Sequence, residues 1–271
     1  MVDACKSGQQ ELRPYIQIIN YSPEWLPGGR VGLTVRPGII GDMGDFTVMT
    51  YNVGNGLAPP LLLARALRES GADIIGLEEL MTEQAGAIQQ HLRDIYPHQI
   101  LYGMGIPGKG ILSRYPIVAS TQLELHPERP DLHGFIEMGG RELQIIVAHP
   151  PPPRLHRTGI HLTKEARQQF EMLLQAAVSG EPTILLGDFN MGDRQAQYSI
   201  LKAAALSDAF REAGVGSGVT FPRRRGRVRL VPMVRIDYIW YTQHVRATRA
   251  WVGADAGSDH LPVMAEMVWQ E

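Results

Sequence analysis

Seven short polar segments, each at the end of an apolar run, constrain this chain more than any other feature of its sequence. Their carboxylate, amide and imidazole side chains follow runs with the length and composition of buried strands. Polar residues in this position gather at one edge of a sheet, where α/β folds usually build their sites. The segments are TYNVG (50–54), LEEL (77–80), GILSRYP (110–116), AHP (148–150), GDFN (187–190), RIDYIW (235–240) and SDHLP (258–262).

The spread of these segments indicates one large domain. The chain has 271 residues, and the segments are distributed evenly from Asn52 to His260. We therefore predict a single catalytic domain over residues 46–271. Proline and glycine interrupt every apolar run of residues 1–45, where we predict an irregular N-terminal arm.

The hydrophobic periodicity predicts an α/β fold with more strands than helices. Neighbouring strands are joined by turns too short for a helix, such as Gly139-Gly140, so the sheets should be mixed and largely antiparallel. The predicted strands are 46–52, 73–77, 98–103, 110–114, 117–125, 142–149, 183–187, 236–241, 245–252 and 262–269, and the predicted helices are 60–70, 82–95, 162–179 and 195–205.

The composition excludes several classes of protein. A net charge of −2 gives no global basic field, so any attraction to phosphates must be local. A single cysteine, Cys5, excludes an internal disulfide framework and fits a reducing compartment. No apolar stretch approaches the roughly 20 residues of a membrane-spanning helix, and no signal peptide is recognisable. We expect a soluble, cytoplasmic protein.

Carboxylate and amide oxygens at strand ends suit magnesium or manganese, which take one or two carboxylates directly and keep several waters. Glu79 with Asn52 beside it is the best candidate for this site, and Glu78 is a rival for the role of Glu79. Asp188, Asn190 and Asp259 are candidates to hold a second cation, bound waters or a phosphate. Taken alone, Glu79 and Asn52 are also consistent with a solvated strand end and a turn.

The GDFN segment brings an acid and an amide to the end of a buried run. On an extended backbone Asp188 and Asn190 would share one side while Phe189 points inward, although an Asx turn is the alternative. Asp237 and His260 form the predicted acid–imidazole pair, because a carboxylate fixes the tautomer of a histidine and raises its basicity for activating water.

His149 follows the apolar run of residues 143–147 and precedes four prolines. A positively charged or donating imidazole in this position would hold a phosphate oxygen. The alternative is a core histidine whose hydrogen bonds are satisfied within the fold.

The seven segments, in this order, resemble the endonuclease/exonuclease/phosphatase superfamily, relatives of deoxyribonuclease I and exonuclease III. The resemblance covers roughly residues 46–270. It implies a four-layer α/β sandwich, in which two packed sheets are flanked by helices, with a divalent metal between the sheet edges. The segments depart from the family at Glu78, where many members have glutamine, and at Ala148, where a hydroxyl residue is common.

The same resemblance implies a role for each matching residue. Each role is carried over only to the position that matches the family pattern. Asn52 and Glu79 would be metal-site residues with Asp259 near the metal, His149 would contact the phosphate, Asp188 and Asn190 would position the nucleophile and the scissile phosphate, and Asp237 would orient the catalytic His260.

The substrate has to be inferred from the rim of the site. Arg223, Arg224 and Arg225 head an arginine cluster before the strand that carries Asp237, and they are the candidate phosphate-binding residues; a solvated charged loop is the alternative. We expect a phosphoesterase with nucleic acid slightly favoured as substrate. The alternative is a phospholipid or isoprenoid-phosphate head group at an anionic lipid surface, although no loop stands out in the sequence as an apolar bilayer anchor. A non-catalytic phosphate- or nucleic-acid-binding module is a more remote alternative.

Overall fold

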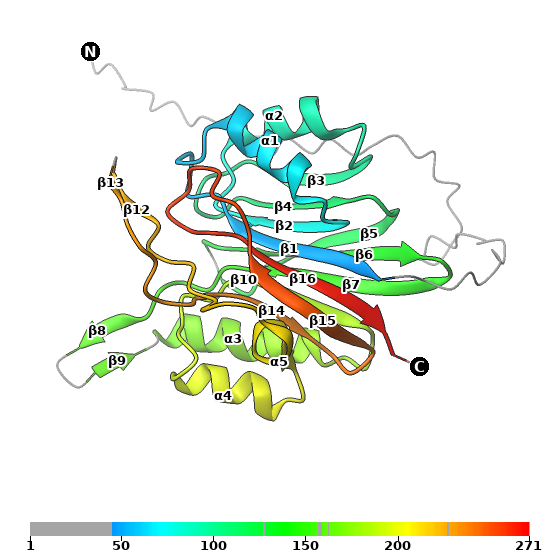
Figure 1. Ribbon diagram of the computed structural model, residues 1–271. Helices are drawn as coiled ribbons and strands as arrows, with labels where there is room; N and C mark the ends of the chain where they lie inside the picture. The colour runs from blue at the N-terminus through cyan, green and yellow to red at the C-terminus, as the bar shows by residue number, and fades with distance from the viewer. Residues whose placement is uncertain (1–44, 127, 157–158, 162, 227, 271) are drawn as a thin grey trace, which may run out of the picture. The chain divides into compact units, whose positions relative to one another are not determined.

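The computed structural model describes residues 45–270 except 127, 157–158, 162 and 227. The arm predicted for residues 1–45 therefore lies outside the described residues, apart from Asp45. Two six-stranded sheets form the centre of the fold (Figure 1). The first contains β1 (Phe46–Asn52), β2 (Ile74–Glu78), β3 (His98–Tyr102), β4 (Lys109–Ser113), β15 (Val245–Val252) and β16 (Val263–Trp269). The second contains β5 (Ile117–Leu123), β6 (Asp131–Met138), β7 (Arg141–Ala148), β10 (Thr183–Asp188), β11 (Ser207–Asp208) and β14 (Asp237–Tyr241).

The sheets are mixed and largely antiparallel, as the sequence predicts. The strand order is β15-β16-β1-β2-β4-β3 in the first sheet and β11-β14-β10-β7-β6-β5 in the second. Each sheet has one parallel pair, β1 with β2 and β7 with β10, and its other strand pairs are antiparallel. The carboxyl ends of these four central strands carry four of the seven polar segments, TYNVG, LEEL, AHP and GDFN.

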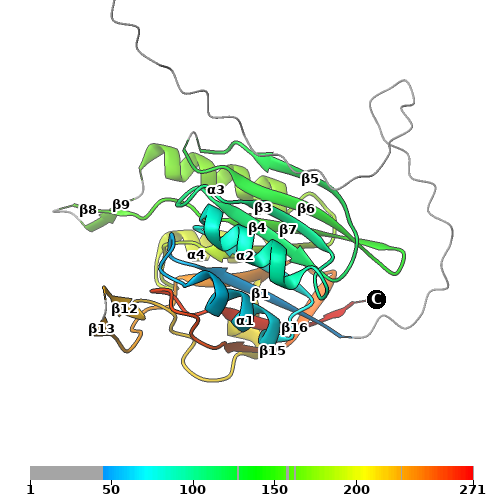
Figure 2. The same ribbon diagram turned by 90° about the horizontal axis from the view of Figure 1, so that it is seen from above.

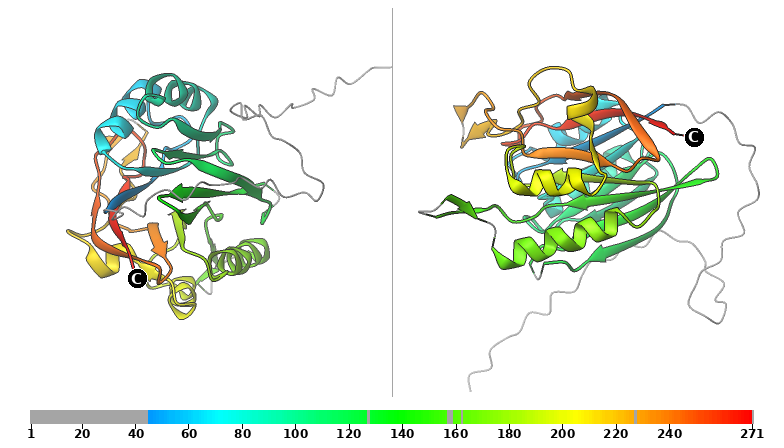
Figure 3. Two further views of the ribbon diagram at one scale, coloured as in Figure 1. Left: turned by 90° about the vertical axis from the view of Figure 1, so that its right-hand side faces the viewer. Right: turned by 90° about the horizontal axis from the view of Figure 1, so that it is seen from below.

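Helices cover the outer faces and complete the four-layer sandwich (Figure 3). The helices are α1 (Pro60–Ser70), α2 (Thr82–Leu92), α3 (Lys164–Ala177), α4 (Ala196–Ala203) and α5 (Ala209–Ala213). Leu63 and Leu67 of α1 pack with Ile75 on the outer face of the first sheet. Phe170 and Leu173 of α3 pack with Leu185 on the outer face of the second. The fold class predicted from the sequence is therefore confirmed.

A third apolar layer fills the space between the sheets. Val48 and Ile74 of the first sheet meet Val147, Leu186 and Ile239 of the second. A glycine in β2 permits the close approach, since a Cβ at Gly76 would stand 2.0 Å from Cδ1 of Leu186. The two sheets are thus held in close contact beneath the polar strand ends.

Several elements of the structure depart from the prediction. Strand β6 was not predicted, because Asp131, His133 and Gly134 obscure the alternation of Leu132 and Ile136. Helix α3 begins at Lys164 because the Thr163 side chain accepts a hydrogen bond from the backbone of Ala166 at 3.1 Å. Two hairpins, β8–β9 (Arg154–His156 and Gly159–His161) and β12–β13 (Arg224–Arg225 and Val228–Arg229), extend from the sheets (Figure 2). Within the described residues no helix has the length and apolarity to span a membrane.

Candidate active site

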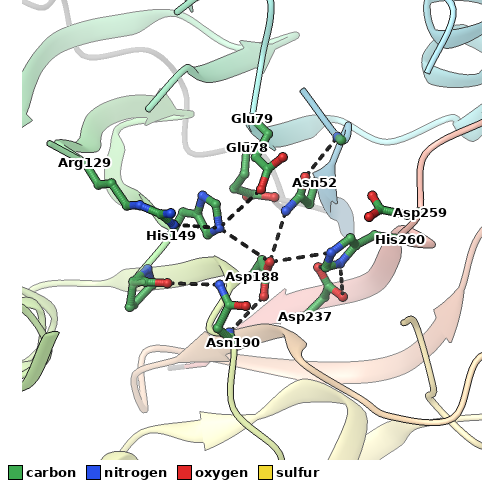
Figure 4. A network of polar contacts seen from close by, with 12 residues as sticks. Asn52, Glu78, Glu79, Arg129, His149, Asp188, Asn190, Asp237, Asp259 and His260 are labelled. Atoms are coloured by element: carbon green, nitrogen blue, oxygen red, sulfur yellow. Dashed lines mark hydrogen bonds and ion pairs between the residues drawn. The ribbon is translucent and has the colours of Figure 1, made fainter. Parts of the chain in front are cut away.

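The candidate site is the polar end of the apolar layer between the sheets. Along each central strand, alternate residues face this layer: Val48 on β1, Ile74 on β2, Val147 near the end of β7, Leu186 on β10 and Ile239 on β14. Because every second residue of a strand faces the same side, the inward-facing positions at the strand ends are occupied by polar residues. These residues are Thr50, Asn52, Glu78, His149, Asp188 and Asp237, all of them buried. Strand alternation thus gathers side chains from five strands at one place (Figure 4).

Asp188 lies at the centre of this cluster. Its Oδ2 atom is 3.0 Å from Nδ2 of Asn52, 3.6 Å from Nε2 of His149 and 3.7 Å from Nε2 of His260. The side chain is 2 % exposed. Three nitrogen atoms from both sheets and from the segment before β16 therefore converge on one carboxylate oxygen.

His260 is fixed in orientation by Asp237. Its Nδ1 atom lies 3.1 Å and 3.0 Å from the two carboxylate oxygens of Asp237, so Nε2 is directed toward Asp188. The hydroxyl of Thr220 donates a hydrogen bond to Oδ2 of Asp237, and the ring of Phe221 lies 4.7 Å from the imidazole between centroids. The structure thus brings together the predicted acid–imidazole pair and adds two residues that hold it.

The carboxylates determine the charge of the site. Burial would lower the pKa of His260, but the charges of Asp237 and Asp188 outweigh it and raise the pKa to about 10. Burial raises the pKa of Asp188 to about 7, and the charge of Asp237 adds to this while that of His260 opposes it. The carboxylates thus favour the charged imidazole of His260, and burial favours the neutral form of Asp188.

The two glutamates of the LEEL segment have different surroundings. Glu78 is fully buried on the inner face of β2, where Oε1 accepts a hydrogen bond from Thr50 at 2.9 Å and Oε2 has no partner among the described residues. Glu79 follows the strand with a left-handed φ of 55°, and its side chain is 21 % exposed. Burial raises the pKa of both. Of the two rivals, Glu79 is the carboxylate that reaches the surface.

The predicted metal-site residues lie beside Glu79. The Oδ1 atom of Asn52 accepts a hydrogen bond from the backbone of Gly54, and its Nδ2 atom donates to Asp188. Asp259 carries a charge close enough to affect the pKa of both Glu79 and His260. A second set of possible ligands comes from residues predicted to be catalytic, because ligand atoms of Asp188, Asp237 and His260 lie within 4.8 Å of one another.

Asn190 departs from its predicted geometry. Its φ of 51° is left-handed, and its backbone N–H donates to Oδ1 of Asp188 at 2.8 Å, which is the Asx turn that was the alternative. Asp188 and Asn190 therefore do not share one side of an extended strand. The turn instead directs Nδ2 of Asn190 to the carbonyl of Pro150, at 3.0 Å. Phe189 points into the core, as predicted.

His149 is buried in a way that keeps it neutral. Burial lowers its pKa well below the usual range, and the charges of Lys109 and Arg129 lower it further. These effects favour the neutral imidazole over the charged one. Its backbone N–H donates to Oδ1 of Asp131 at 3.0 Å, and Asp131 is held in turn by Gln169 at 2.7 Å.

Two cations near His149 were not singled out from the sequence. Nη1 of Arg129 lies 3.4 Å from Nε2 of His149, and Lys109 is buried with no hydrogen-bond partner for Nζ among the described residues. Burial lowers the pKa of Lys109, while Asp131 and Glu78 oppose this. Arg129 lies outside all seven segments, and Lys109 immediately precedes one, so neither had a motif to identify it.

The predicted phosphate-binding arginines lie beside the cluster rather than in it. The backbone N–H of Arg223 donates to the carbonyl of Asp259, but its Nε atom is 3.0 Å from Oδ2 of Asp255, so its charge is already paired. Arg224 is half-buried, and Arg225 is exposed on the hairpin β12–β13. Of the three, Arg225 is the one whose side chain is exposed to solvent.

Comparisons with known proteins identify the family and agree with the fold. Residues 49–260 match the Endonuclease/Exonuclease/phosphatase family. The uncharacterised protein YbhP of Escherichia coli strain K12 is 27 % identical over 270 residues, which cover 82 % of this chain and 96 % of that protein. The structure of an endonuclease/exonuclease/phosphatase from Beutenbergia cavernae has a TM-score of 0.68 and 22 % identity, covering 83 % of this chain and 72 % of the other.

Solved structures with named activities have the same fold. Sphingomyelinase C from Streptomyces griseocarneus has a TM-score of 0.63 and 20 % identity, covering 82 % of this chain and 99 % of that one. Zebrafish (D. rerio) TDP2, complexed with a single-strand DNA product, has a TM-score of 0.62 and 19 % identity, covering 83 % and 99 %. A mannosyl-6-phosphatase from Bacteroides thetaiotaomicron has a TM-score of 0.65 and 20 % identity, covering 83 % of this chain and 100 % of that one. From the extent of the sequence match, this chain belongs to the endonuclease/exonuclease/phosphatase family.

Proposed function

We propose that the chain is a divalent-metal-dependent hydrolase of phosphate esters. The observation that carries the proposal is the convergence on Asp188, whose Oδ2 atom lies within 3.7 Å of nitrogen atoms of Asn52, His149 and His260. The imidazole nitrogens of His149 and His260 lie 3.6 Å and 3.7 Å from this carboxylate, beyond hydrogen-bond distance, so each is able to contact an oxygen of a phosphate bound beside Asp188. Membership of a family of phosphoesterases supports the same chemistry.

A divalent cation fits the donor set. The buried carboxylates of Glu78 and Asp188 have raised pKa values, first because of burial and then because of neighbouring carboxylates, and a dication would relieve both effects. We assign Mg²⁺ or Mn²⁺ to Glu79 and Asn52 with Asp259 beside them, because Glu79 is more exposed than Asp188 or Asp237. When bound, the cation would neutralise charge on the phosphoryl group and orient the ester.

The side chains of the chain then supply positioning and proton transfer. In hydrolysis the oxygen of water forms a bond to phosphorus, the ester P–O bond breaks, water loses a proton and the leaving oxygen gains one. His260 carries out this proton transfer at Nε2, between the water and the leaving oxygen, because Asp237 engages Nδ1. Asp188, held by the Asx turn of Asn190, orients the water, and neutral His149 donates to a phosphate oxygen.

Two substrate classes fit this chemistry, because each offers a phosphate ester to the same donors. The arginine cluster supports a polyanion such as nucleic acid, and the similarity of fold to TDP2 is compatible with that class. Val231 and Met233 are 81 % and 72 % exposed on the segment that adjoins His260, which favours a lipid phosphate head group. With the exposed side chains known, we place the lipid class ahead of nucleic acid.

The test is hydrolysis by the purified protein with magnesium, manganese or chelator. Plasmid DNA, phospholipids, isoprenoid phosphates and a sugar phosphate are assayed in parallel. We expect metal-dependent turnover that His260→Ala lowers by about two orders of magnitude, while His91→Ala, on the exposed side of α2, leaves it unchanged. Turnover that persists in chelator, or near-wild-type activity of His260→Ala, would contradict the proposal.

A further inference from the structure

We propose that the described residues of the loop 223–226 and 228–234, here called the docking loop, bind the surface of an anionic lipid bilayer. The docking loop contains the hairpin β12–β13 and the segment that leads from it back to β14. The proposed binding depends on the exposed side chains of this loop and not on the hydrolysis of an ester. It can therefore be tested without turnover.

The docking loop exposes an unusual density of aliphatic side chains. Val228, Val231, Met233 and Val234 are 63 %, 81 %, 72 % and 44 % exposed, and they lie within seven residues of sequence. Single exposed aliphatic residues are common on proteins, but a concentration of them marks a surface that binds something apolar. The sequence does not single out this loop, because its aliphatic residues form no continuous apolar run.

The same loop is strongly basic. In the sequence, residues 223–234 hold five arginines, of which Arg227 lies outside the described residues, and no acidic residue, while the whole chain has a net charge of −2. Arg225 and Arg229 are exposed; Asp255 lies 3.0 Å from Arg223 and 3.9 Å from Arg229. Exposed arginines beside exposed aliphatic side chains are complementary to an anionic membrane, where phosphate head groups lie above acyl chains.

The position of the loop connects it to the site. The backbone of Arg223 donates to the carbonyl of Asp259, and Phe221 exchanges backbone hydrogen bonds with Val234 and contacts His260 with its ring tilted by 41°. Exposed aliphatic residues also lie next to Glu79: Asn55 donates to its carbonyl, and Leu57 and Met104 are 43 % and 61 % exposed on adjoining loops. A bilayer bound at the docking loop would therefore lie beside the cluster around Asp188.

Nucleic acid is less well matched to this surface. Bases stack on aromatic side chains, and the docking loop has none in its sequence. Phe221, which precedes the loop, already packs against the ring of His260. Exposed valine and methionine side chains add nothing to the binding of a phosphate backbone, but they gain from burial among acyl chains.

The experiment measures binding of the full chain to vesicles by co-sedimentation, in chelator so that no ester is hydrolysed. Vesicles of phosphatidylcholine alone are compared with vesicles that also contain phosphatidylglycerol. The variant Val231→Ser with Met233→Ser removes the apolar contacts, and Arg225→Gln with Arg229→Gln removes the charges. The matched control, Val215→Ser with Met172→Ser, changes two other aliphatic residues that are 61 % and 45 % exposed. Circular dichroism and thermal unfolding check that each variant is folded.

We expect preferential binding to the phosphatidylglycerol vesicles. Each docking-loop variant should weaken it by about tenfold or more, and the control should bind like the wild type. Equal sedimentation with both vesicle types, or wild-type binding by Val231→Ser with Met233→Ser, would overturn the proposal. Binding of a DNA oligonucleotide that depends on Arg225 and Arg229 but not on Val231 and Met233, with no vesicle binding, would overturn it in favour of nucleic acid.

Discussion

Asp188 and Asp237 stand directly opposite each other on the antiparallel strands β10 and β14. Two carboxylates in such a cross-strand pair repel one another. His260 offsets the repulsion, because its Nδ1 and Nε2 atoms lie 3.0 Å and 3.7 Å from oxygens of Asp237 and Asp188 respectively. One imidazole thus holds together an acidic pair that the fold would otherwise disfavour, at the place where we propose that a phosphate reacts.

The first prediction concerns Asp237. Asp237→Asn keeps the size of the side chain but removes the charge that holds His260 in its orientation and protonation state, so kcat should fall by about 100-fold or more with little change in KM. Steady-state kinetics on the best substrate of the panel measure this. Asp193→Asn, whose side chain is 48 % exposed, is the control. A kcat within about threefold of the wild type would exclude the role of Asp237.

A second prediction distinguishes the two possible sets of metal ligands. If Glu79 and Asn52 hold the cation, Glu79→Gln should weaken binding of Mg²⁺ or Mn²⁺ by about tenfold or more, while Asp237→Asn changes it little. Isothermal titration calorimetry without substrate measures both variants. The reverse order of effects would place the cation in the group formed by Asp188, Asp237 and His260.

Arg129 provides a third prediction. Its guanidinium lies 3.4 Å from Nε2 of His149 and offers a positive contact to a phosphate bound there. Arg129→Gln should raise KM by about tenfold, and Arg129→Lys should recover part of the loss because it restores the charge but not the bidentate geometry. Arg167→Gln on the exposed side of α3 is the matched control. Unchanged KM in Arg129→Gln would assign this arginine to packing alone.

A fourth prediction concerns stability near the site. Arg235 begins the RIDYIW segment, and its Nη1 atom lies 2.7 Å from Oδ2 of Asp208, which is 1 % exposed. Arg235→Ala would leave a buried carboxylate without its cation and should lower the free energy of unfolding by about 3 kcal/mol. Arg249→Ala breaks the exposed pair with Glu266 and should cost about 0.5 kcal/mol or less. Urea unfolding compares the two, and equal losses would show that Asp208 does not need its partner.

The strand periodicity explains why much of the site could be predicted. Asn52, His149 and Asp188 each continue the inward face of an apolar strand, so a period of two brings them to one sheet edge. Arg129 and Lys109 could not be predicted because neither belongs to one of the seven polar segments. The left-handed turn at Asn190 depends on a hydrogen bond to Asp188. The residue types alone do not determine whether this segment forms the turn or an extended strand.

The docking loop shows a different limit of sequence reading. Val228, Val231, Met233 and Val234 are separated by arginine and proline, so they form no continuous apolar run that a hydropathy pattern would identify. In the fold, Phe221 and Val234 exchange backbone hydrogen bonds at one end of this loop. Only the folded arrangement shows that these four side chains are exposed.

The most direct test of the central claim is hydrolysis in isotopically labelled water, with the phosphate product analysed by mass spectrometry. With magnesium or manganese, the wild type should place one labelled oxygen on phosphorus for each ester bond broken. Asp188→Ala and the wild type in chelator should place none. Labelling that continues without Asp188, or that needs no metal, would contradict the account of a divalent-metal-dependent phosphoesterase centred on this residue.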